Sequence, residues 1–180
     1  MPRMYGKTVV LRELRGEDLP DLRAWMTDGP TADMLGDRFT RPQTWEQTEE
    51  YLRERLEGAA GGAHFAIAEP EKLRYLGEIS LTGIDAVARR ARLTVVLKPE
   101  CQGRGYGTEA VRLMLRYAFD YLNLERVALA VQADNPRAIR AYEKAGFVHE
   151  GRLRREVYRA GKYVDVLMMG ILREEFVEQE

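Results

Sequence analysis

The segment between residues 91 and 131 constrains the fold more than any other part of the chain. Apolar and polar residues alternate over residues 91–97, as in a half-buried strand, and Pro99 ends that pattern. Apolar residues then recur at helical spacing over residues 105–122, and residues 126–131 are again typical of a strand. Two strands joined through a helix form a crossover that places them parallel in one sheet.

The helix of this crossover should contribute two apolar stripes to the core. Residues three or four positions apart lie on the same face of a helix, and apolar side chains follow that spacing along the whole predicted helix. The first stripe is Ala110, Met114, Tyr117 and Tyr121, and the second is Val111, Leu115, Ala118 and Leu122. We expect both stripes to be buried.

Three glycines at alternate positions stand between the first strand and the helix, in the run Gln102-Gly103-Arg104-Gly105-Tyr106-Gly107-Thr108. Backbone N–H groups at such a helix N-terminus favour a bound phosphate. An ATP- or GTP-hydrolysing loop would need a Lys followed by Ser or Thr, which is missing here. Residues 105–110 fit the dinucleotide pattern G-x-G-x-x-[GA], but that fingerprint normally lies in the first βαβ unit. This loop lies past the middle of the chain, so a dinucleotide is disfavoured.

The other segments also show alternating periods. A helix that starts at Asp18 or Asp21 should end near Gly29-Pro30. Thr44 should cap the next helix, with Gln47 completing a capping box, and Gly58 should end it. Further strands are predicted at residues 8–14, 64–68, 75–82, 151–158 and 162–171.

A second segment with chemical character follows the crossover, over residues 134–147. Asn135 is a good helix N-cap, Pro136 suits the first helical position, and Gly146 suits the left-handed position after the helix. Helices that follow adjacent parallel strands begin at one cleft, at the carboxyl ends of those strands. Tyr142, about two turns into this helix, should reach that cleft.

Composition limits the class of protein. The chain has 180 residues, 45% of them hydrophobic, which suits a single domain over residues 1–180. Its net charge of −1 predicts no nucleic-acid partner, and we interpret the basic residues Arg152, Arg154 and Arg155 as a solvated strand face. The single cysteine, Cys101, allows neither an internal disulfide nor a cysteine-rich zinc site, so no metal is expected. Lacking an apolar leader or a bilayer-spanning run, the chain should be cytoplasmic and bind no membrane.

Together the two motifs resemble the GNAT superfamily of N-acetyltransferases. Gln102-x-x-Gly105-x-Gly107 matches the family pattern [RQ]-x-x-G-x-[GA], and the segment from Asn135 to Phe147 is similar to the second conserved block. The resemblance covers nearly the whole chain and is strongest to the branch of ribosomal-protein N-terminal and polyamine acetyltransferases. It implies an α/β (α+β) fold with a mixed, largely antiparallel central sheet, a splayed parallel strand pair, and helices on both faces.

The resemblance implies acetyl-CoA as the cofactor. In the family, backbone amides of the glycine loop hold the pyrophosphate of coenzyme A, and the free edge of the preceding strand pairs with the pantetheine arm. Arg104 can add charge to the pyrophosphate contact. The cofactor-binding residues implied in this sequence are Val95, Val96, Leu97, Gln102, Gly103, Arg104, Gly105, Tyr106, Gly107, Thr108, Asn135 and Tyr142.

The implied reaction is direct acetyl transfer from the thioester to a primary amine. A phenol with a pKa of about 10 can protonate or hydrogen-bond the departing thiolate, and Tyr142 holds the family position for this role. Asn135 is implied as the second catalytic residue, both as helix cap and as a polar contact near the sulfur. A strand amide around Val96 or Leu97 would meet the developing oxyanion. Cys101 is not expected to be a nucleophile, because no histidine partner is evident.

The general base and the acceptor stay open at this point. Glu78, Asp85, His64 and water are the candidates for the base. An alkylamine, with a pKa of about 10.4, costs roughly 3 kcal/mol more to deprotonate than an α-amine of about 8. Because no unmistakable base is present, an α-amine such as a protein N-terminus is favoured over a polyamine or an aminoglycoside.

Acceptor binding should involve residues 34–45 and the two closing strands. A non-catalytic acyl-CoA-binding or interaction module is the alternative function, and the chain is expected to be a monomer or a homodimer. The candidate acceptor residues are Phe39, Trp45 and Tyr158 as an apolar wall, and Asp33, Asp37 or Asp165 as partners of a cation.

Overall fold

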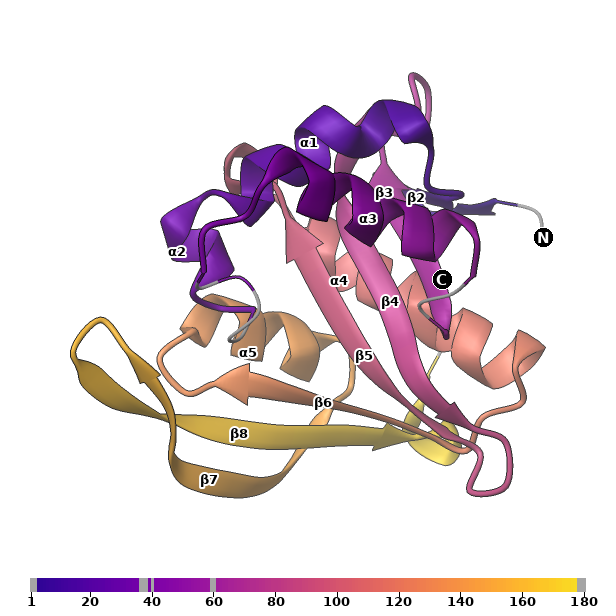
Figure 1. The fold of residues 1–180 in the computed structure, drawn as a ribbon. Helices are drawn as coiled ribbons and strands as arrows, with labels where there is room; N and C mark the ends of the chain where they lie inside the picture. Colours follow the sequence, from indigo (N-terminus) through magenta and orange to yellow (C-terminus); the bar gives the residue numbers. More distant parts are fainter. Residues whose placement is uncertain (1–2, 36–38, 40, 59–60, 178–180) are drawn as a thin grey trace.

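The computed structural model describes residues 3–35, 39, 41–58 and 61–177. In this part of the chain eight strands form one sheet, in the spatial order β1-β2-β3-β4-β5-β6-β8-β7 (Figure 1). All neighbouring strands are antiparallel except β5 and β6, so the predicted mixed, largely antiparallel sheet is confirmed. The strands are β1 Met4–Tyr5, β2 Val10–Arg12, β3 Ala63–Ala68, β4 Tyr75–Asp85, β5 Arg90–Leu97, β6 Arg126–Gln132, β7 Val148–Arg159 and β8 Lys162–Leu172.

The parallel pair β5–β6 opens after three residue pairs. Residues 90–92 lie opposite residues 126–128, and no pairing follows toward the carboxyl ends of the two strands. In Figure 1 the two arrows start together and then diverge. β5 stays paired with β4 up to Leu97, and β6 stays paired with β8 up to Gln132. The strands therefore splay as the family resemblance implied, with each half of the sheet intact.

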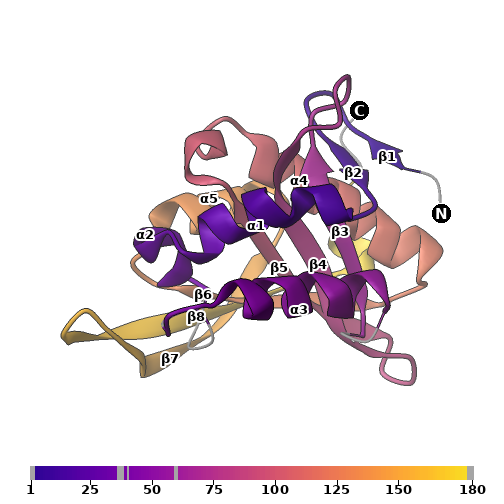
Figure 2. The same cartoon turned by 45° about the horizontal axis from the view of Figure 1, so that its top comes forward.

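Helices cover both faces of the sheet, as Figure 2 shows. Helices α4 Tyr106–Arg116 and α5 Pro136–Lys144 lie on one face, over the larger apolar core. Helices α1 Leu19–Met26 and α3 Trp45–Leu56 lie on the other face, over a smaller core around Trp25. None of the helices in the described part has the length and apolar character that crossing a bilayer requires.

The first major strand is shorter than predicted from residues 8–14. β2 ends at Arg12, and the chain turns into a short 3-10 helix, η1 Gly16–Asp18. Buried Asp18 accepts two hydrogen bonds from the Arg12 guanidinium, at 2.7 and 2.8 Å, and one from the backbone N–H of Arg15 at 2.9 Å. This buried ion pair turns the chain, which the alternation of apolar residues does not reveal.

The crossover helix changes its pitch before its predicted end. After α4 the chain continues as a π-helical turn, η4 Tyr117–Tyr121, in which the N–H of Leu122 donates to the carbonyl of Tyr117 at 3.1 Å. The wider turn changes which side chains face the sheet. Tyr121 is 62% exposed, so the prediction that it belongs to a buried stripe is wrong.

The predicted end of the first helix, near Gly29-Pro30, is instead the start of another one. Helix α2 Gly29–Ala32 begins there, with Asp28 as its N-cap accepting the N–H of Thr31 at 3.0 Å. Asp-Gly-Pro carries a helix-start signal, because an acidic cap precedes a proline in the first turn. Because Gly and Pro usually interrupt helices, the sequence pattern predicted a helix end at this position instead.

Helices α3 and α5 begin where their capping residues predict. Thr44 and Gln47 form the expected capping box of α3. Asn135 Oδ1 accepts the N–H of Ala138 at 3.2 Å, which caps α5, and Gly146 follows α5 with a φ of +102°. These caps fix the start of α5 next to the end of β6.

Candidate active site

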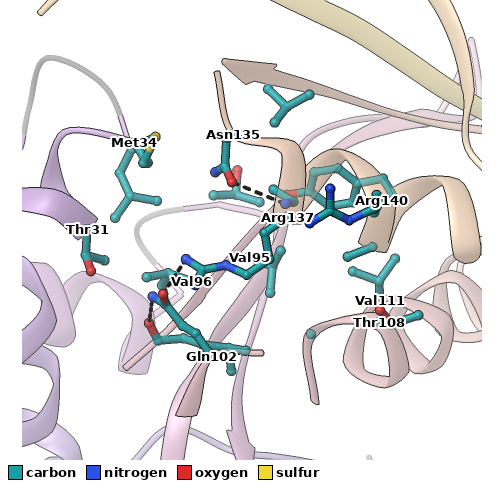
Figure 3. A pocket seen from close by; sticks show the side chains of 18 of the residues that line it. Thr31, Met34, Val95, Val96, Gln102, Thr108, Val111, Asn135, Arg137 and Arg140 are labelled. Carbon is teal, nitrogen blue, oxygen red and sulfur yellow. Dashed lines mark hydrogen bonds between the residues drawn. The ribbon is translucent and has the colours of Figure 1, made fainter. Parts of the chain in front are cut away.

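A cleft of about 790 Å³ opens where β5 and β6 separate. Its walls are the splayed ends of the two strands, the glycine loop with the start of α4, helix α5, and the segment around α2. Figure 3 shows Thr31 and Met34 on one side, Asn135 and Arg140 on the other, and Val95 between them. The volume lies within the range of small-molecule sites, about 300–1,000 Å³. Both sequence motifs therefore line the same cleft.

The glycine loop leaves the N-terminus of α4 open. Gly103 and Gly105 have φ values of +75° and +87°, in the left-handed region that glycine adopts without strain. Gly105 is the N-cap of α4, and no side chain caps the helix. The first N–H groups of α4 therefore stay available to an anion, which the helix dipole also favours.

Gln102 links the end of β5 to the start of α5. Its Nε2 donates to the carbonyl oxygen of Leu97 at 3.0 Å, and its Oε1 accepts a hydrogen bond from Arg137 Nη2. Figure 3 shows the Arg137 side chain extending from α5 past Val95 and Val96 to reach Gln102. A polar bridge thus crosses the cleft between its two walls.

Three basic side chains of α5 that were not among the predicted site residues line the cleft. Arg137, Arg140 and Lys144 lie at intervals of three and four residues, so they share one face of the helix. Asp28 is the one acidic residue among the described residues that line the cleft. The α5 side of the cleft is therefore suited to a polyanionic ligand. The helical spacing of Arg137, Arg140 and Lys144 after the Asn135 cap is the sequence signal that could have identified these residues.

Ten of the twelve residues predicted to bind the cofactor line this cleft. They are Val95, Val96, Leu97, Gln102, Gly103, Gly105, Gly107, Thr108, Asn135 and Tyr142. The other two are not among the lining residues. Arg104 is exposed on the loop, and Tyr106 packs partly buried against the larger core.

Tyr142 enters the cleft from α5 and is almost fully buried. The side chain is 8% exposed, and its ring packs edge-on against Phe147 with 5.9 Å between centroids. Burial raises the pKa of Tyr142 to about 12. Its hydroxyl makes no hydrogen bond with any residue of the described chain. Asn135 uses Oδ1 for the helix cap, so its amide nitrogen is left to face the cleft.

Asp85, one of the candidates for the general base, does not line the cleft. It lies at the turn between β4 and β5, where its carboxylate accepts the N–H groups of Ala88 at 2.9 Å and Val87 at 3.0 Å. These bonds, with Arg90 nearby, lower the pKa of its carboxyl group. The turn precedes β5, whereas the cleft begins beyond residue 92, so Asp85 stabilises the hairpin.

Glu78 on β4 and His64 on β3 lie one and two strands away from β5, and neither lines the cleft. Glu78 is 2% exposed, and its Oε1 accepts from Arg55 Nε at 2.8 Å and Tyr51 Oη at 3.3 Å. His64 Nδ1 lies 3.7 Å from the same oxygen, and its Nε2 contacts the carbonyl of Gly61 at 2.6 Å. Glu78 stands opposite Val96 in the sheet, so a cleft residue separates it from the site.

The structure does not assemble the predicted apolar wall. Phe39 packs against Trp25 at 5.6 Å, whereas the Arg23 guanidinium lies over Trp45, and Tyr158 pairs with Tyr163. Of residues 34–45, only Met34 and Leu35 are among the described lining residues, and Asp37 lies outside the described part of the chain.

The proposed cation partners are used elsewhere or stand apart. Asp165 pairs with Arg152 at 2.6 Å and accepts the N–H of Arg155 at 2.8 Å. Asp33 is half-buried beside the cleft, and its backbone carbonyl accepts from Gln132 Nε2 at 2.7 Å. Gln132, a lining residue that sequence reasoning missed, thereby ties the α2 segment to the end of β6.

Cys101 is a buried free thiol, and burial raises its pKa. A raised pKa favours the protonated thiol over the nucleophilic thiolate. In the described part of the chain no cluster of three or more His, Cys, Asp or Glu side chains could hold a metal ion.

Both the sequence and the fold of this chain are similar to those of known proteins. The model of the acetyltransferase (GNAT) domain matches residues 8–148. The chain belongs to the GNAT acetyltransferase family. A GNAT relative from Vibrio cholerae, spermidine N(1)-acetyltransferase, is 29% identical over 92% of this chain and 95% of its own length. A putative ribosomal N-acetyltransferase from Bacillus subtilis, YdaF, is 34% identical over 56% of this chain and 55% of its own length.

A solved GNAT structure shares the fold over nearly its whole length. The crystal structure of spermidine N-acetyltransferase from Vibrio cholerae in complex with CoA and spermine superposes with a TM-score of 0.84 and 27% identity. It covers 94% of this chain and 98% of that one. The chain described here is accordingly an N-acetyltransferase that uses acetyl-CoA and transfers the acetyl group to an amine.

Proposed function

We propose that this GNAT enzyme acetylates a primary amine of a polyamine-like acceptor in the cleft between β5 and β6. The observation that carries the proposal is that the glycine loop, Asn135 and Tyr142 all line that one cleft. The relative named for spermidine aligns over nearly the whole of both chains, which supports a polyamine over the α-amine that the sequence alone favoured. The ribosomal relative aligns over about half, so a protein N-terminus is the second candidate.

The cleft fits a ligand with the chemistry of coenzyme A. Beyond residue 92, β5 has lost its partner on the β6 side, so its backbone groups can pair with an amide-bearing arm. The uncapped start of α4 can receive a pyrophosphate, and Arg137, Arg140 and Lys144 supply positive charge. We propose that these residues hold the cofactor.

In the proposed reaction the neutral amine attacks the thioester carbonyl carbon. The C–N bond forms, the C–S bond breaks, and the amine loses one proton. Tyr142 would donate to the sulfur that leaves as a thiolate, and Asn135 would contact it through its amide. A phenol of pKa about 12 is a weaker acid than a thiol of about 8.5. We therefore propose that Tyr142 donates a hydrogen bond to the sulfur rather than its whole proton.

We propose that water carries away the proton of the amine. Glu78 is already hydrogen-bonded to Arg55 and Tyr51, and it lies behind Val96. Asp28, the acid among the described lining residues, is engaged in capping α2 through Thr31. Asp28 belongs to the α2 segment, whereas the basic lining residues belong to α5, and we propose that Asp28 binds a second, charged amine of the acceptor.

The proposal is tested by measuring coenzyme A thiol release from acetyl-CoA with a panel of spermidine, spermine, N-terminal peptides and aminoglycosides. We expect the highest kcat/KM with the polyamines. A preference for the peptides would overturn the acceptor class and leave the chemistry intact. No turnover of any amine, with acetyl-CoA binding retained, would instead support a non-catalytic acyl-CoA-binding module.

We further propose that the enzyme is a single domain that works in the cytoplasm. One sheet contains strands from Met4 to Leu172, and both apolar cores pack against its two faces, so the described chain forms one folding unit. The free thiol of Cys101 suits a reducing compartment.

A further inference from the structure

The bridge between Arg137 and Gln102 lies where the proposed cofactor must pass. Gln102 follows β5 and Arg137 lies in the first turn of α5, so their hydrogen bond joins the two walls that the splay separates. In Figure 3 the Arg137 side chain runs past Val95 and Val96, along the edge of β5 that has no partner. A ligand that pairs with this edge would compete with the bridge for the same space.

The two side chains of the bridge differ in the other hydrogen bonds that they make. The Nε2 of Gln102 is held by the carbonyl of Leu97 at 3.0 Å, and this bond does not depend on Arg137. Arg137 is exposed, and its guanidinium has Gln102 as its one hydrogen-bond partner in the described chain. Breaking the bridge therefore leaves Gln102 anchored, and it leaves a free cation at the glycine loop.

A guanidinium binds a phosphate group more strongly than a neutral amide. Its planar donors match two oxygens of a phosphate, and the opposite charges strengthen both hydrogen bonds. A ligand with a diphosphate can thus take Arg137 from Gln102 at a net gain. A ligand without phosphate must break the same bridge and gains nothing in return.

We infer that Arg137 makes the cleft selective for thioester donors that carry a diphosphate, because Gln102 holds it across the cleft until the diphosphate replaces the amide. This inference rests on the proposed binding of acetyl-CoA between β5 and β6. It separates Arg137 from the other basic residues of the cleft wall. Arg140, one turn further along α5, makes no hydrogen bond with a described residue and does not bridge the cleft.

The test is equilibrium binding by calorimetry, with coenzyme A, dephospho-coenzyme A and pantetheine as three probes. Dephospho-coenzyme A keeps the diphosphate and lacks the 3′-phosphate, whereas pantetheine has no phosphate. In Arg137→Ala we expect both coenzymes to bind about tenfold more weakly, as expected for a lost charge-assisted hydrogen bond at an exposed site. Pantetheine should bind severalfold more tightly than to the wild type, because no bridge has to break.

Arg140→Ala is the matched control, since it removes the same charge from the same helix. It should weaken the binding of coenzyme A but leave that of pantetheine as in the wild type. Pantetheine binding that is no tighter in Arg137→Ala than in the wild type would overturn the inference that the bridge opposes ligands without phosphate. Unchanged dephospho-coenzyme A affinity in Arg137→Ala would show that Arg137 does not bind the diphosphate.

These outcomes are distinct from a failure of the proposed function. If the wild type binds none of the three probes, the proposed cofactor site is wrong and the inference falls with it. If the wild type binds coenzyme A and Arg137→Ala behaves like Arg140→Ala with all three probes, only the inference is overturned.

Discussion

The phenol of Tyr142 combines burial with a hydroxyl that bonds no described residue. Because burial raises its pKa to about 12, from about 10 in the unfolded chain, the folded protein keeps the phenol protonated throughout the neutral range. The stability linked to this shift is complete below about pH 10 and is lost as the pH rises toward 12. A fall in kcat between pH 7 and 10 would therefore report another group.

Replacing Tyr142 with Phe should remove the proposed donor and keep the ring that packs on Phe147. We expect kcat to fall by about 10²-fold or more, the usual effect of losing a donor at the reacting centre. The affinity for acetyl-CoA and the melting temperature should stay close to those of the wild type. Steady-state kinetics, calorimetry and thermal unfolding check the three expectations.

Tyr121→Phe is the matched control, because it removes the same hydroxyl at a position that is 62% exposed. It should leave kcat unchanged. A Tyr142→Phe enzyme that turns over as fast as the wild type would remove this phenol from the reaction.

The sequence predicted residues that act through local chemistry better than residues that act through distant contacts. Asn135 caps α5 and Tyr142 follows it by seven positions, so one helical segment brings both to the cleft. Local sequence patterns could not decide whether Glu78 or Asp85 lies at the site as the general base. Their surroundings depend on Arg55 from another helix and on the turn at Ala88, which pattern alone does not place.

At the scale of elements, the turn into α4 uses its glycines for different reasons. Gly103 and Gly105 need their left-handed backbone, so a side chain at either position strains the loop itself. Gly107 lies within the first turn of α4 with an ordinary φ, and a Cβ there would meet only Leu97 Cδ1, at 3.5 Å. Gly107 is therefore the position at which a substitution tests the phosphate cradle without straining the backbone.

Gly107→Val should weaken acetyl-CoA binding by about tenfold or more, because its branched side chain fills space at the uncapped start of the helix. The fold should survive, since helix propensity at this position changes by less than about 1 kcal/mol. Calorimetry with acetyl-CoA measures the loss, and thermal unfolding checks the fold.

Gly107→Ala is the control, because the family pattern admits alanine at this position and the added Cβ makes only an ordinary contact. It should bind acetyl-CoA nearly as well as the wild type. Wild-type affinity in Gly107→Val would contradict the assignment of this loop as the phosphate cradle.

Element boundaries show where sequence patterns lose information. The caps at Thr44 and Asn135 placed two helix starts correctly, because a cap satisfies backbone groups within its own turn. The π-helical turn at Tyr117 and the end of β2 beside Asp18 depend on contacts with the rest of the fold. Helical periodicity continues past Tyr117, so the sequence alone could not show that Tyr121 turns outward.

At the scale of the whole molecule, the sheet consists of two antiparallel halves. Strands β1 to β5 form one half, and β6, β8 and β7 form the other. Three residue pairs between β5 and β6 join them, although the helices on both faces add further contacts. A ligand that contacts β5, the glycine loop and α5 together would bind both halves at once.

Coenzyme A should therefore raise the melting temperature of the protein. A ligand that binds only the folded state at 100 times its Kd adds about 2.7 kcal/mol to the free energy of unfolding. Thermal unfolding with increasing coenzyme A should show a graded rise for the wild type, and a smaller one for Gly107→Val. A melting temperature independent of coenzyme A would contradict binding across the two halves.

The open edge between β5 and β6 also allows hydrogen exchange of the sheet amides to report whether the cleft is occupied. Most sheets keep their inner amides protected from solvent, but here residues 93–97 and 129–132 border an internal edge without a partner strand. The amides that point to this open edge should exchange with deuterium far faster than their neighbours that face β4 or β8. A bound pantetheine arm would slow the exchange along β5, so the middle of the sheet records whether the donor is present.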